Sequence, residues 1–238
     1  MKKAFMILAV WAMVFATGCH KDPENGGNNG GGNGGNSNPT TGTVNGHEWI
    51  DLGLPSGILW ATCNVGANSP EEYGDYFAWG ETTAKETYEW STYKYNDGNN
   101  LTKYTGSDNR EVLEASDDAA HVNWGGAWRM PTADELRELR DNCIHKCTTQ
   151  NGVNGHLFTA LNGNSLFLPA AGNIYDGEFH YPGGIGSYWS SSLSTDNHNT
   201  YRPYNAMYFS FNLVDFQVPY CSRYLGLTVR PVCSVFQK

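Results

Sequence analysis

Residue types that could carry catalysis occur in this chain, but not at the spacing that catalysis needs. Ser190, Ser191 and Ser192 could offer a nucleophile, yet no candidate base lies near them in the sequence, and such a run more often pairs across a strand. The chain contains no His-Glu-x-x-His, Gly-x-Ser-x-Gly or phosphate-loop motif, and its 7 His are scattered. We therefore expect no catalytic residues and predict that the protein is not an enzyme.

The candidate metal ligands are equally sparse. Asp117 and Asp118 could bind a hard cation together with Glu114, because calcium prefers carboxylate oxygens. The sequence favours the alternative, in which these acids lie at a helix end or in a turn. No cofactor is expected.

Five cysteines follow Cys19, namely Cys63, Cys143, Cys147, Cys221 and Cys233. An odd count leaves one thiol over if two disulfides form. Cys143 and Cys147 could lie one turn apart on a helix, where the spacing is too wide for a relaxed disulfide, unless the helix ends before them. The sequence leaves the pairing open.

The amino-terminal segment has the pattern of an export signal. Two lysines precede a charge-free run over residues 4–16 that is too short to span a bilayer. Residues 16–19, Ala-Thr-Gly-Cys, resemble the bacterial lipobox, in which the cysteine receives diacylglycerol. We expect Cys19 to be lipidated and to anchor the chain to a membrane. The alternative is an ordinary cleaved signal followed by a structural Cys19.

A polar tether is expected between the anchor and the folded domain. Residues 20–24, His-Lys-Asp-Pro-Glu, resemble the signal that sends lipoproteins of Bacteroidota to the outer face of the outer membrane. Residues 25–38 are all Gly, Asn or Ser, so they have no apolar side chain to bury and are predicted to be a coil. The predicted domains are a signal peptide over 1–18, a lipidated cysteine and disordered tether over 19–43, and one folded domain over 44–238. The whole is predicted to be an outer-membrane lipoprotein exposed at the cell surface.

Charge and composition narrow the class of partner. The 238 residues include 15 Lys+Arg against 24 Asp+Glu, a formal net charge of -9, with no basic cluster outside residues 1–3. A nucleic-acid partner is not expected, because such proteins neutralise phosphates with a basic surface. The 14 Tyr and 8 Trp, among abundant Gly, Asn and Ser, predict a protein of strands and loops with few long helices.

One helix is strongly signalled. Residues 132–135, Thr-Ala-Asp-Glu, have the form of a capping box, and Leu136, Leu139 and Cys143 follow at helical spacing. A second, shorter helix is expected over residues 111–120. Together with many short strands, two helices predict an α+β domain.

The strands are expected mainly as hairpins. Residues 47–52 and 58–62 flank one turn, and residues 158–160 and 165–168 flank another. Near the end, Met207, Phe209 and Phe211 alternate with polar residues, and the phase then changes so that Phe216 and Val218 become the buried set. A turn over residues 212–215 explains this change. A final strand is expected over residues 226–232.

Several short motifs follow one another in a specific order over about residues 44–235. The most specific is Gly-Gly-Ala-Trp-Arg-Met-Pro-Thr at residues 125–132, followed by Glu135 and Leu136. Further motifs lie at residues 52–57, 73–81, 168–172, 188–192 and 229–232. Together they resemble the Fibrobacter succinogenes major paralogous domain.

The resemblance implies an α+β fold like that of C-type lectins and of the formylglycine-generating enzyme. Two helices would flank a twisted, mainly antiparallel and loop-rich sheet in which the amino- and carboxy-terminal strands pair. Trp128 would enter the core, Arg129 would be satisfied by a carboxylate or by carbonyls, and Pro131 would set the helix entry. The calcium triplets of lectins are absent, and the residues around Cys221 and Cys233 depart from the active-site pattern of the copper-dependent enzyme. A metal-dependent lectin or a formylglycine-generating-enzyme-like oxidase is therefore kept as the alternative function.

The same fold is used by variable proteins of diversity-generating retroelements, whose segment after a Tyr-Trp-Ser-Ser-Ser stretch is diversified for ligand binding. Tyr, Asn and Ser after Ser192 have the character of such a surface. The predicted ligand-binding residues are Tyr188, Asn199, Tyr201, Tyr204, Tyr208, Ser210, Asn212, Tyr220, Ser222 and Tyr224. The expected partner is a protein or glycan, which would make the protein a receptor or adhesin. The alternative is that these are ordinary exposed strand residues, and Met207 and Gln217 do not fit adenine-specific diversification.

Overall fold

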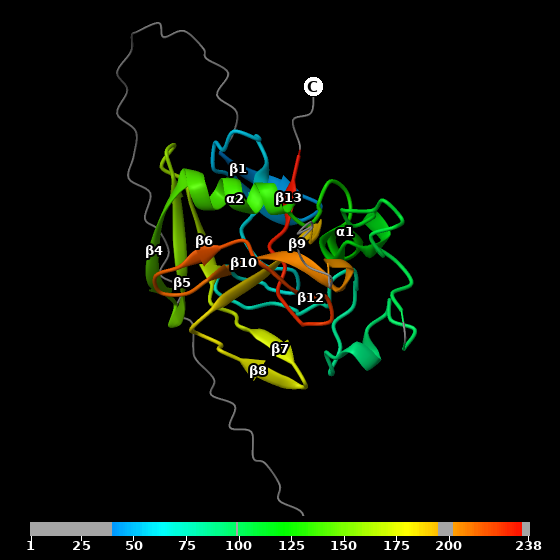
Figure 1. The fold of residues 1–238 in the computed structure, drawn as a ribbon. Helices are drawn as coiled ribbons and strands as arrows, with labels where there is room; N and C mark the ends of the chain where they lie inside the picture. Colours follow the sequence, from blue (N-terminus) through cyan, green and yellow to red (C-terminus); the bar gives the residue numbers. More distant parts are fainter. Residues whose placement is uncertain (1–39, 99, 195–201, 235–238) are drawn as a thin grey trace, which may run out of the picture. The chain divides into compact units, whose positions relative to one another are not determined.

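The computed structural model describes residues 40–98, 100–194 and 202–234. Within these ranges the chain forms an α+β fold with two α-helices and several antiparallel sheets (Figure 1). The predicted signal peptide, Cys19 and the tether up to residue 39 lie outside the described residues, as do Asn199 and Tyr201. Among the described helices, none has the length and apolar character needed to cross a membrane.

The helices and strands are short. The α-helices are α1 (Ala119–Trp124) and α2 (Ala133–Asn142), and three 3-10 helices lie at Trp90–Thr92, Ala115–Asp117 and Arg202–Tyr204. The strands are β1 (Thr41–Val44), β2 (His47–Asp51), β3 (Leu59–Ala61), β4 (Cys143–Gln150), β5 (Val153–Ala160), β6 (Ser165–Pro169), β7 (Asn173–Tyr175), β8 (Glu178–His180), β9 (Gly186–Leu193), β10 (Asn205–Phe211), β11 (Phe216–Gln217), β12 (Tyr220–Ser222) and β13 (Val232–Cys233).

The first sheet joins the two ends of the domain. Its order is β1-β2-β3-β13, with Trp49 opposite Ala61 and Val232 opposite Trp60. The predicted hairpin over residues 47–62 is confirmed, and the terminal strands share a sheet as expected. The strand predicted over residues 226–232 is wrong in extent. Residues 226–228 make isolated bridges to three different partners, so only β13 continues as a strand.

Helix α2 begins where the sequence predicted. Thr132 Oγ1 accepts a hydrogen bond from the Glu135 amide at 3.2 Å, and Glu135 Oε2 accepts one from the Thr132 amide at 2.8 Å. Glu135 also binds Arg129 through two hydrogen bonds of 2.6 and 2.8 Å, and Trp128 is fully buried, so both expected roles are confirmed. The helix ends at Asn142, which places Cys143 and Cys147 on β4 rather than on a helix.

The second helix lies later than predicted. Residues 111–113 pair with β9, because the Leu113 amide donates to Ser191 and the Leu193 amide donates to Glu111. Asp118 then caps α1 by accepting a hydrogen bond from the His121 amide at 2.9 Å. Long-range pairing of this kind leaves no local signal in the sequence.

The sheet of β9 and β10 is buried on both faces, so the predicted binding residues on these two strands do not form an open surface. On one face, Tyr188, Phe209 and Phe211 pack in a core cluster with side chains of α2, β5 and β6. On the other face, Trp189 and Ala206 belong to a second core cluster formed with the loops of residues 65–113. Strands β4, β5 and β6 form a separate antiparallel sheet beside this core (Figure 1).

Candidate functional site

Tyr188 is not a surface residue, which corrects its assignment to the ligand-binding set. It is 1% exposed, and its hydroxyl donates a hydrogen bond to the Pro169 carbonyl at 2.6 Å. Burial raises the pKa of this hydroxyl above its ordinary value. The physical reason is that β9 has a core cluster on each face. The alternation of side chains along this strand therefore does not separate an exposed face from a buried one.

Apart from Tyr220, the predicted residues on β10, on β12 and in the β10–β11 turn are half-buried rather than outward-facing. Tyr208 packs against Trp189 with ring centroids 6.2 Å apart, and burial raises the pKa of its hydroxyl. Ser210 and Ser222 are also half-buried within the sheet. The side-chain oxygen of Asn212 accepts hydrogen bonds from two amides of the β10–β11 turn, each 3.0 Å, so it supports the predicted turn.

The partly exposed residues that remain form an aromatic cluster, which we define as Trp90, Tyr204 and Tyr224. The Trp90 ring lies 5.5 Å from the Tyr204 ring and 5.0 Å from the Tyr224 ring, centroid to centroid. Buried Tyr93 supports Trp90 from below at 5.4 Å. The cluster brings together two predicted residues and one that the sequence analysis missed, because nothing local distinguishes Trp90 from the other aromatics of residues 70–90.

Tyr220 is the most exposed of the predicted tyrosines that the structure describes, at 40%. It lies on β12 opposite Met207. Met207 is itself half-buried, whereas Phe209 and Phe211 are buried as predicted. Of the described residues in the predicted set, Tyr220 is thus the exposed one. Tyr204 and Tyr224 are half-buried, like Tyr208, and differ from it in that both contact Trp90.

Arg223 positions the aromatic cluster from inside the protein. Its guanidinium is fully buried and donates to the Tyr93 hydroxyl at 2.8 Å and to the Pro203 carbonyl at 2.8 Å, directly beside Tyr204. Two further hydrogen bonds, each 3.1 Å, reach the carbonyls of Lys103 and Tyr104. The guanidinium carbon also lies 4.8 Å from the Trp79 ring centroid, within cation–π range. No local pattern in the sequence distinguishes Arg223.

The candidate cation ligands serve structural roles. Asp117 binds Lys94, Lys103 and the hydroxyl of Tyr104, while Asp118 caps α1 and accepts from the Met130 amide. The helix-end role favoured by the sequence is thus observed for Asp118. In the part of the chain that the structure describes, no group of three or more His, Cys, Asp or Glu is arranged to hold a metal ion.

Asp117 gives the stability a defined pH dependence. Burial raises the pKa of this carboxyl, but hydrogen bonds from Lys103 and Tyr104 outweigh it and bring the pKa to about 2. Because the folded pKa lies below the unfolded value, the contribution is present above about pH 4 and is lost as the pH falls toward 2. We expect the wild type to lose about 2 kcal/mol of unfolding free energy from this group over that interval. Asp117→Asn should lack this component, measured by urea unfolding at about pH 6 and pH 2; equal pH slopes for both proteins would contradict the assignment.

The five described cysteines are all free thiols. Cys221 on β12 packs against one core cluster, whereas Cys233 on β13 belongs to another, so the structure does not bring together the pair that the copper-enzyme alternative needs. Cys143 and Cys233 are buried, and burial raises the pKa of each thiol to about 11. Cys147 is exposed.

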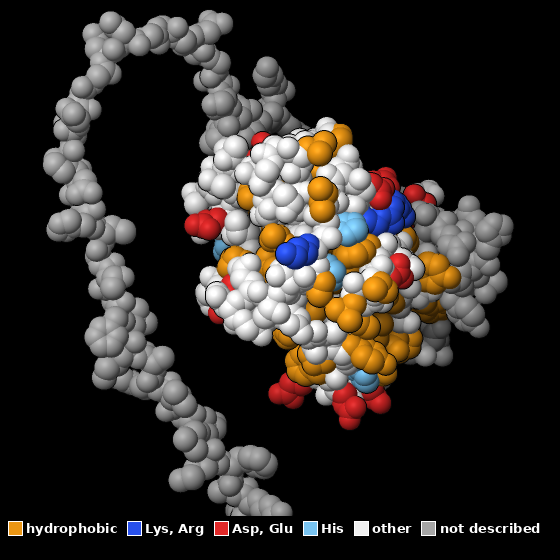
Figure 2. All heavy atoms as spheres, turned by 90° about the vertical axis from the view of Figure 1, so that its left-hand side faces the viewer, with side chains coloured by type: hydrophobic (Ala, Val, Ile, Leu, Met, Phe, Trp, Pro, Cys, Tyr) orange, Lys and Arg blue, Asp and Glu red, His pale blue; other side chains and the backbone are white. Residues whose placement is uncertain are grey.

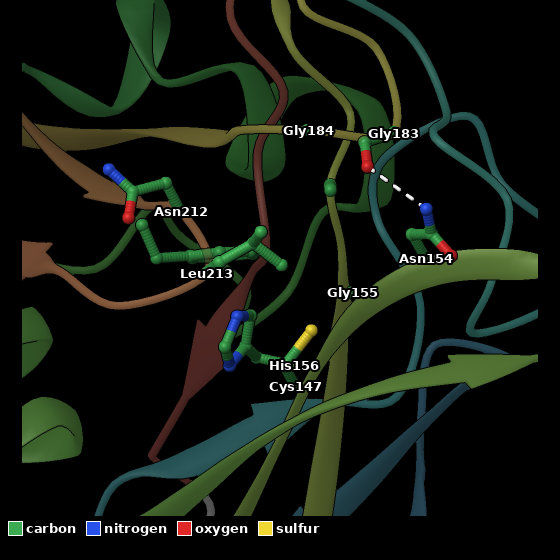
Figure 3. Close-up of a pocket in the computed structure, with 10 residues that line it drawn as sticks. Cys147, Asn154, Gly155, His156, Gly183, Gly184, Asn212 and Leu213 are labelled. Atoms are coloured by element: carbon green, nitrogen blue, oxygen red, sulfur yellow. Dashed lines mark hydrogen bonds between the residues drawn. The ribbon is translucent and has the colours of Figure 1, made fainter.

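A cavity of about 150 Å3 lies where β4 and β5 approach the β10–β11 turn (Figure 3). Cys147 and His156 line it from the strands, Asn212 and Leu213 from the turn, and Gly183 from the loop before β9. Leu213 and Val214 at this turn are exposed apolar side chains. Figure 2 shows a face of the molecule on which many hydrophobic side chains gather. Asn212 thus reaches this cavity, not the aromatic cluster.

Comparison with protein-family models, with curated proteins and with solved structures finds no match for this chain.

Proposed function

We propose that this protein is a surface-anchored lipoprotein that binds a protein or glycan ligand through the aromatic cluster and Tyr220. The observation that carries the proposal is the convergence of half-exposed Trp90, Tyr204 and Tyr224 from three separate segments onto one site. The domain would be C-type-lectin-like and related to the Fibrobacter succinogenes major paralogous domain. The shared sheet of the terminal strands, the two helices, the buried Trp128 side chain and the hydrogen bonds between Arg129 and Glu135 support that relation.

The chemistry of the cluster suits recognition rather than turnover. Trp and Tyr bury a large apolar area on contact while losing few side-chain torsions, and they dominate the energetics of interfaces. Rigid support of the rings lowers the entropic cost of binding further. Here the buried Tyr93 ring packs against Trp90, and Arg223 donates a hydrogen bond to the Tyr93 hydroxyl. Burial raises the pKa of the Tyr224 hydroxyl, with smaller contributions from Cys221 and Asp176, so this hydroxyl stays protonated near neutral pH and can exchange hydrogen bonds with a ligand. A ligand that offers an apolar face together with hydroxyl or N–H donors would match both features.

Capture of ligands from glycan and protein arrays by the full chain tests the proposal. Wild-type protein is expected to give specific hits that the Trp90→Ala/Tyr224→Ala variant loses. Retention of the same hits by a folded variant would show that ligands bind elsewhere.

The anchoring part of the proposal is tested separately. Cys19→Ser should release the protein from the membrane fraction, because acyl chains contribute about 0.8 kcal/mol per buried methylene and nothing replaces them. Fractionation of cells, with protease treatment of intact cells, measures both anchoring and exposure. A Cys19→Ser protein that stays in the membrane fraction, or a wild type shielded from protease, would contradict the lipid-anchored, surface-exposed assignment.

A further inference from the structure

The β7–β8 hairpin adjoins the aromatic cluster. Ile174 of β7 and Gly226 exchange two backbone hydrogen bonds of 2.8 Å in an antiparallel bridge. Asp176 and Tyr224 each lie only two residues from this bridge, which therefore holds them near each other. The Asp176 amide also donates a hydrogen bond of 3.3 Å to the Tyr88 carbonyl, which fixes the turn of the hairpin in place. Burial is the largest cause of the raised pKa of the Tyr224 hydroxyl, and the charge of Asp176 adds to it.

The hairpin presents one aromatic ring and two carboxylates to solvent. Asp176 and Gly177 both have positive φ, 53° and 73°, as the two central residues of a type I′ turn do. Tyr175 and Glu178 flank this turn and lie opposite each other, so their side chains share a face of the hairpin. Tyr175 is 41% exposed, and Asp176 and Glu178 are exposed as well. The hairpin thus extends the aromatic cluster with a surface that is both aromatic and acidic.

No described basic side chain neutralises the two carboxylates. Neither Asp176 nor Glu178 forms an ion pair with a residue that the structure describes. The sequence has no Lys or Arg over residues 147–201, and Lys85, near the Tyr88 ring, is paired with Glu81 at 2.9 Å. The hairpin lies at the lower edge of the view in Figure 1, and at that end of the molecule in Figure 2 acidic side chains border a group of hydrophobic ones. This negative charge is therefore available to a partner.

Aromatic rings beside carboxylates have the chemistry that binds a guanidinium. The face of a Trp or Tyr ring attracts a cation, and Arg is the side chain most often found there. Its planar guanidinium stacks on a ring and can also donate two parallel hydrogen bonds to one carboxylate, whereas a Lys ammonium is a compact point charge. The Trp90 and Tyr224 rings, 5.0 Å apart and tilted by 58°, offer faces in two directions. An arginine side chain would contact both the rings and the acid.

The buried charge of Arg223 is compensated inside the protein. Its guanidinium carbon lies 5.3 Å from the centroid of the Tyr93 ring, which in turn packs against Trp90. Three backbone carbonyl oxygens accept hydrogen bonds from the guanidinium and direct the negative ends of their dipoles toward it. Outside the cluster, a ligand would meet the exposed carboxylates of the hairpin.

We propose that the ligand of the aromatic cluster is a protein segment that presents an arginine, whose guanidinium stacks on the rings of Trp90 and Tyr224 and binds the Asp176 carboxylate. This inference rests on the proposed function, because it names the chemistry of the ligand for the same site. Tyr175 and Glu178 extend the surface for the residues that flank the arginine.

Paired peptide arrays test the proposal. One array carries heptapeptides with a central arginine among varied residues, and the other carries the same peptides with citrulline, which keeps the shape of arginine without its charge. We expect the full chain to prefer the captured arginine peptides about tenfold in dissociation constant, because cation–π stacking and pairing with an exposed carboxylate each contribute about threefold. Equal dissociation constants within the pairs, or capture of glycans but of no peptide, would overturn the proposal.

Asp176→Asn removes the charge and keeps the turn, because Asn-Gly suits a type I′ turn as well as Asp-Gly does. The preference for arginine over citrulline should fall to about threefold, which is what stacking alone provides. Asp215→Asn is the matched control. It removes the same charge from the exposed β10–β11 turn, at the opposite end of β10 from Tyr204, and should keep the tenfold preference. An unchanged preference in Asp176→Asn, or an equal loss in both variants, would overturn the role of Asp176.

This inference and the proposed function fail in different ways. Ligands captured equally by the wild type and by folded Trp90→Ala/Tyr224→Ala, or no capture on any array, would overturn both. Ligands that need Trp90 and Tyr224 but bind equally well with arginine or citrulline would overturn only the arginine inference and leave the binding site standing. If Asp176→Asn does not fold, the comparison of arginine with citrulline peptides on the wild type still decides the question.

Discussion

Replacement of Arg223 by Met is expected to lower the free energy of unfolding by about 3–5 kcal/mol. The guanidinium makes four hydrogen bonds in the interior, three to backbone carbonyls and one to the Tyr93 hydroxyl. Met matches much of its volume but donates nothing, so these buried acceptors would each lose a partner. Urea denaturation followed by tryptophan fluorescence measures the change. Arg223→Lys should recover only part of it, because an ammonium cannot reproduce the planar arrangement of donors.

Arg137 offers the matched control for this prediction. It lies on α2 with a side chain that is 40% exposed, and its partner Asp134 is almost fully exposed. Surface ion pairs of this kind contribute about 0–1 kcal/mol, so Arg137→Met should leave the unfolding free energy nearly unchanged. If Arg223→Met were no more destabilising than Arg137→Met, the carbonyls around Arg223 would have to be satisfied by other means, and its role as the support of the aromatic cluster would be wrong.

Local signals in the sequence predicted the elements whose stability is local. The capping box of Thr132 and Glu135 depends on residues three positions apart, and both hydrogen bonds are present. The change of phase between Phe211 and Phe216 likewise predicted a turn, and the two residues face each other across the β10–β11 pair. The α+β class followed from such elements. In contrast, α1 was misplaced because residues 111–113 pair with β9 across the fold.

The candidate site could be predicted only in part, because exposure depends on what packs over a strand. Alternation at Tyr208 and Ser210 indicated an outward face, but a second core cluster covers that face and leaves both residues half-buried. The prediction that Tyr188 is exposed was wrong for the same reason. Trp90 was missed because its place in the site depends on Tyr204 and Tyr224, which are more than one hundred positions away along the chain.

Substitution of the aromatic cluster is the second change with a large expected effect. Trp and Tyr at the centre of interfaces commonly contribute 2 kcal/mol or more, so Trp90→Ala and Tyr224→Ala should each weaken ligand binding by about thirtyfold. Tyr224→Phe keeps the ring and removes only the hydroxyl, so it should cost less. Phe179→Ala is the matched control, since Phe179 is 59% exposed and aromatic but lies on β8 outside the aromatic cluster. Near-UV circular dichroism of each variant separates lost binding from lost structure.

The most direct test of the binding claim is the dissociation constant for the strongest array ligand, measured by calorimetry on the full-length wild type, Trp90→Ala/Tyr224→Ala and Phe179→Ala proteins. We expect micromolar or tighter binding by the wild type and by Phe179→Ala, and no measurable binding by the folded double variant. Equal affinity for all three proteins, or arrays on which the wild type captures nothing, would contradict it.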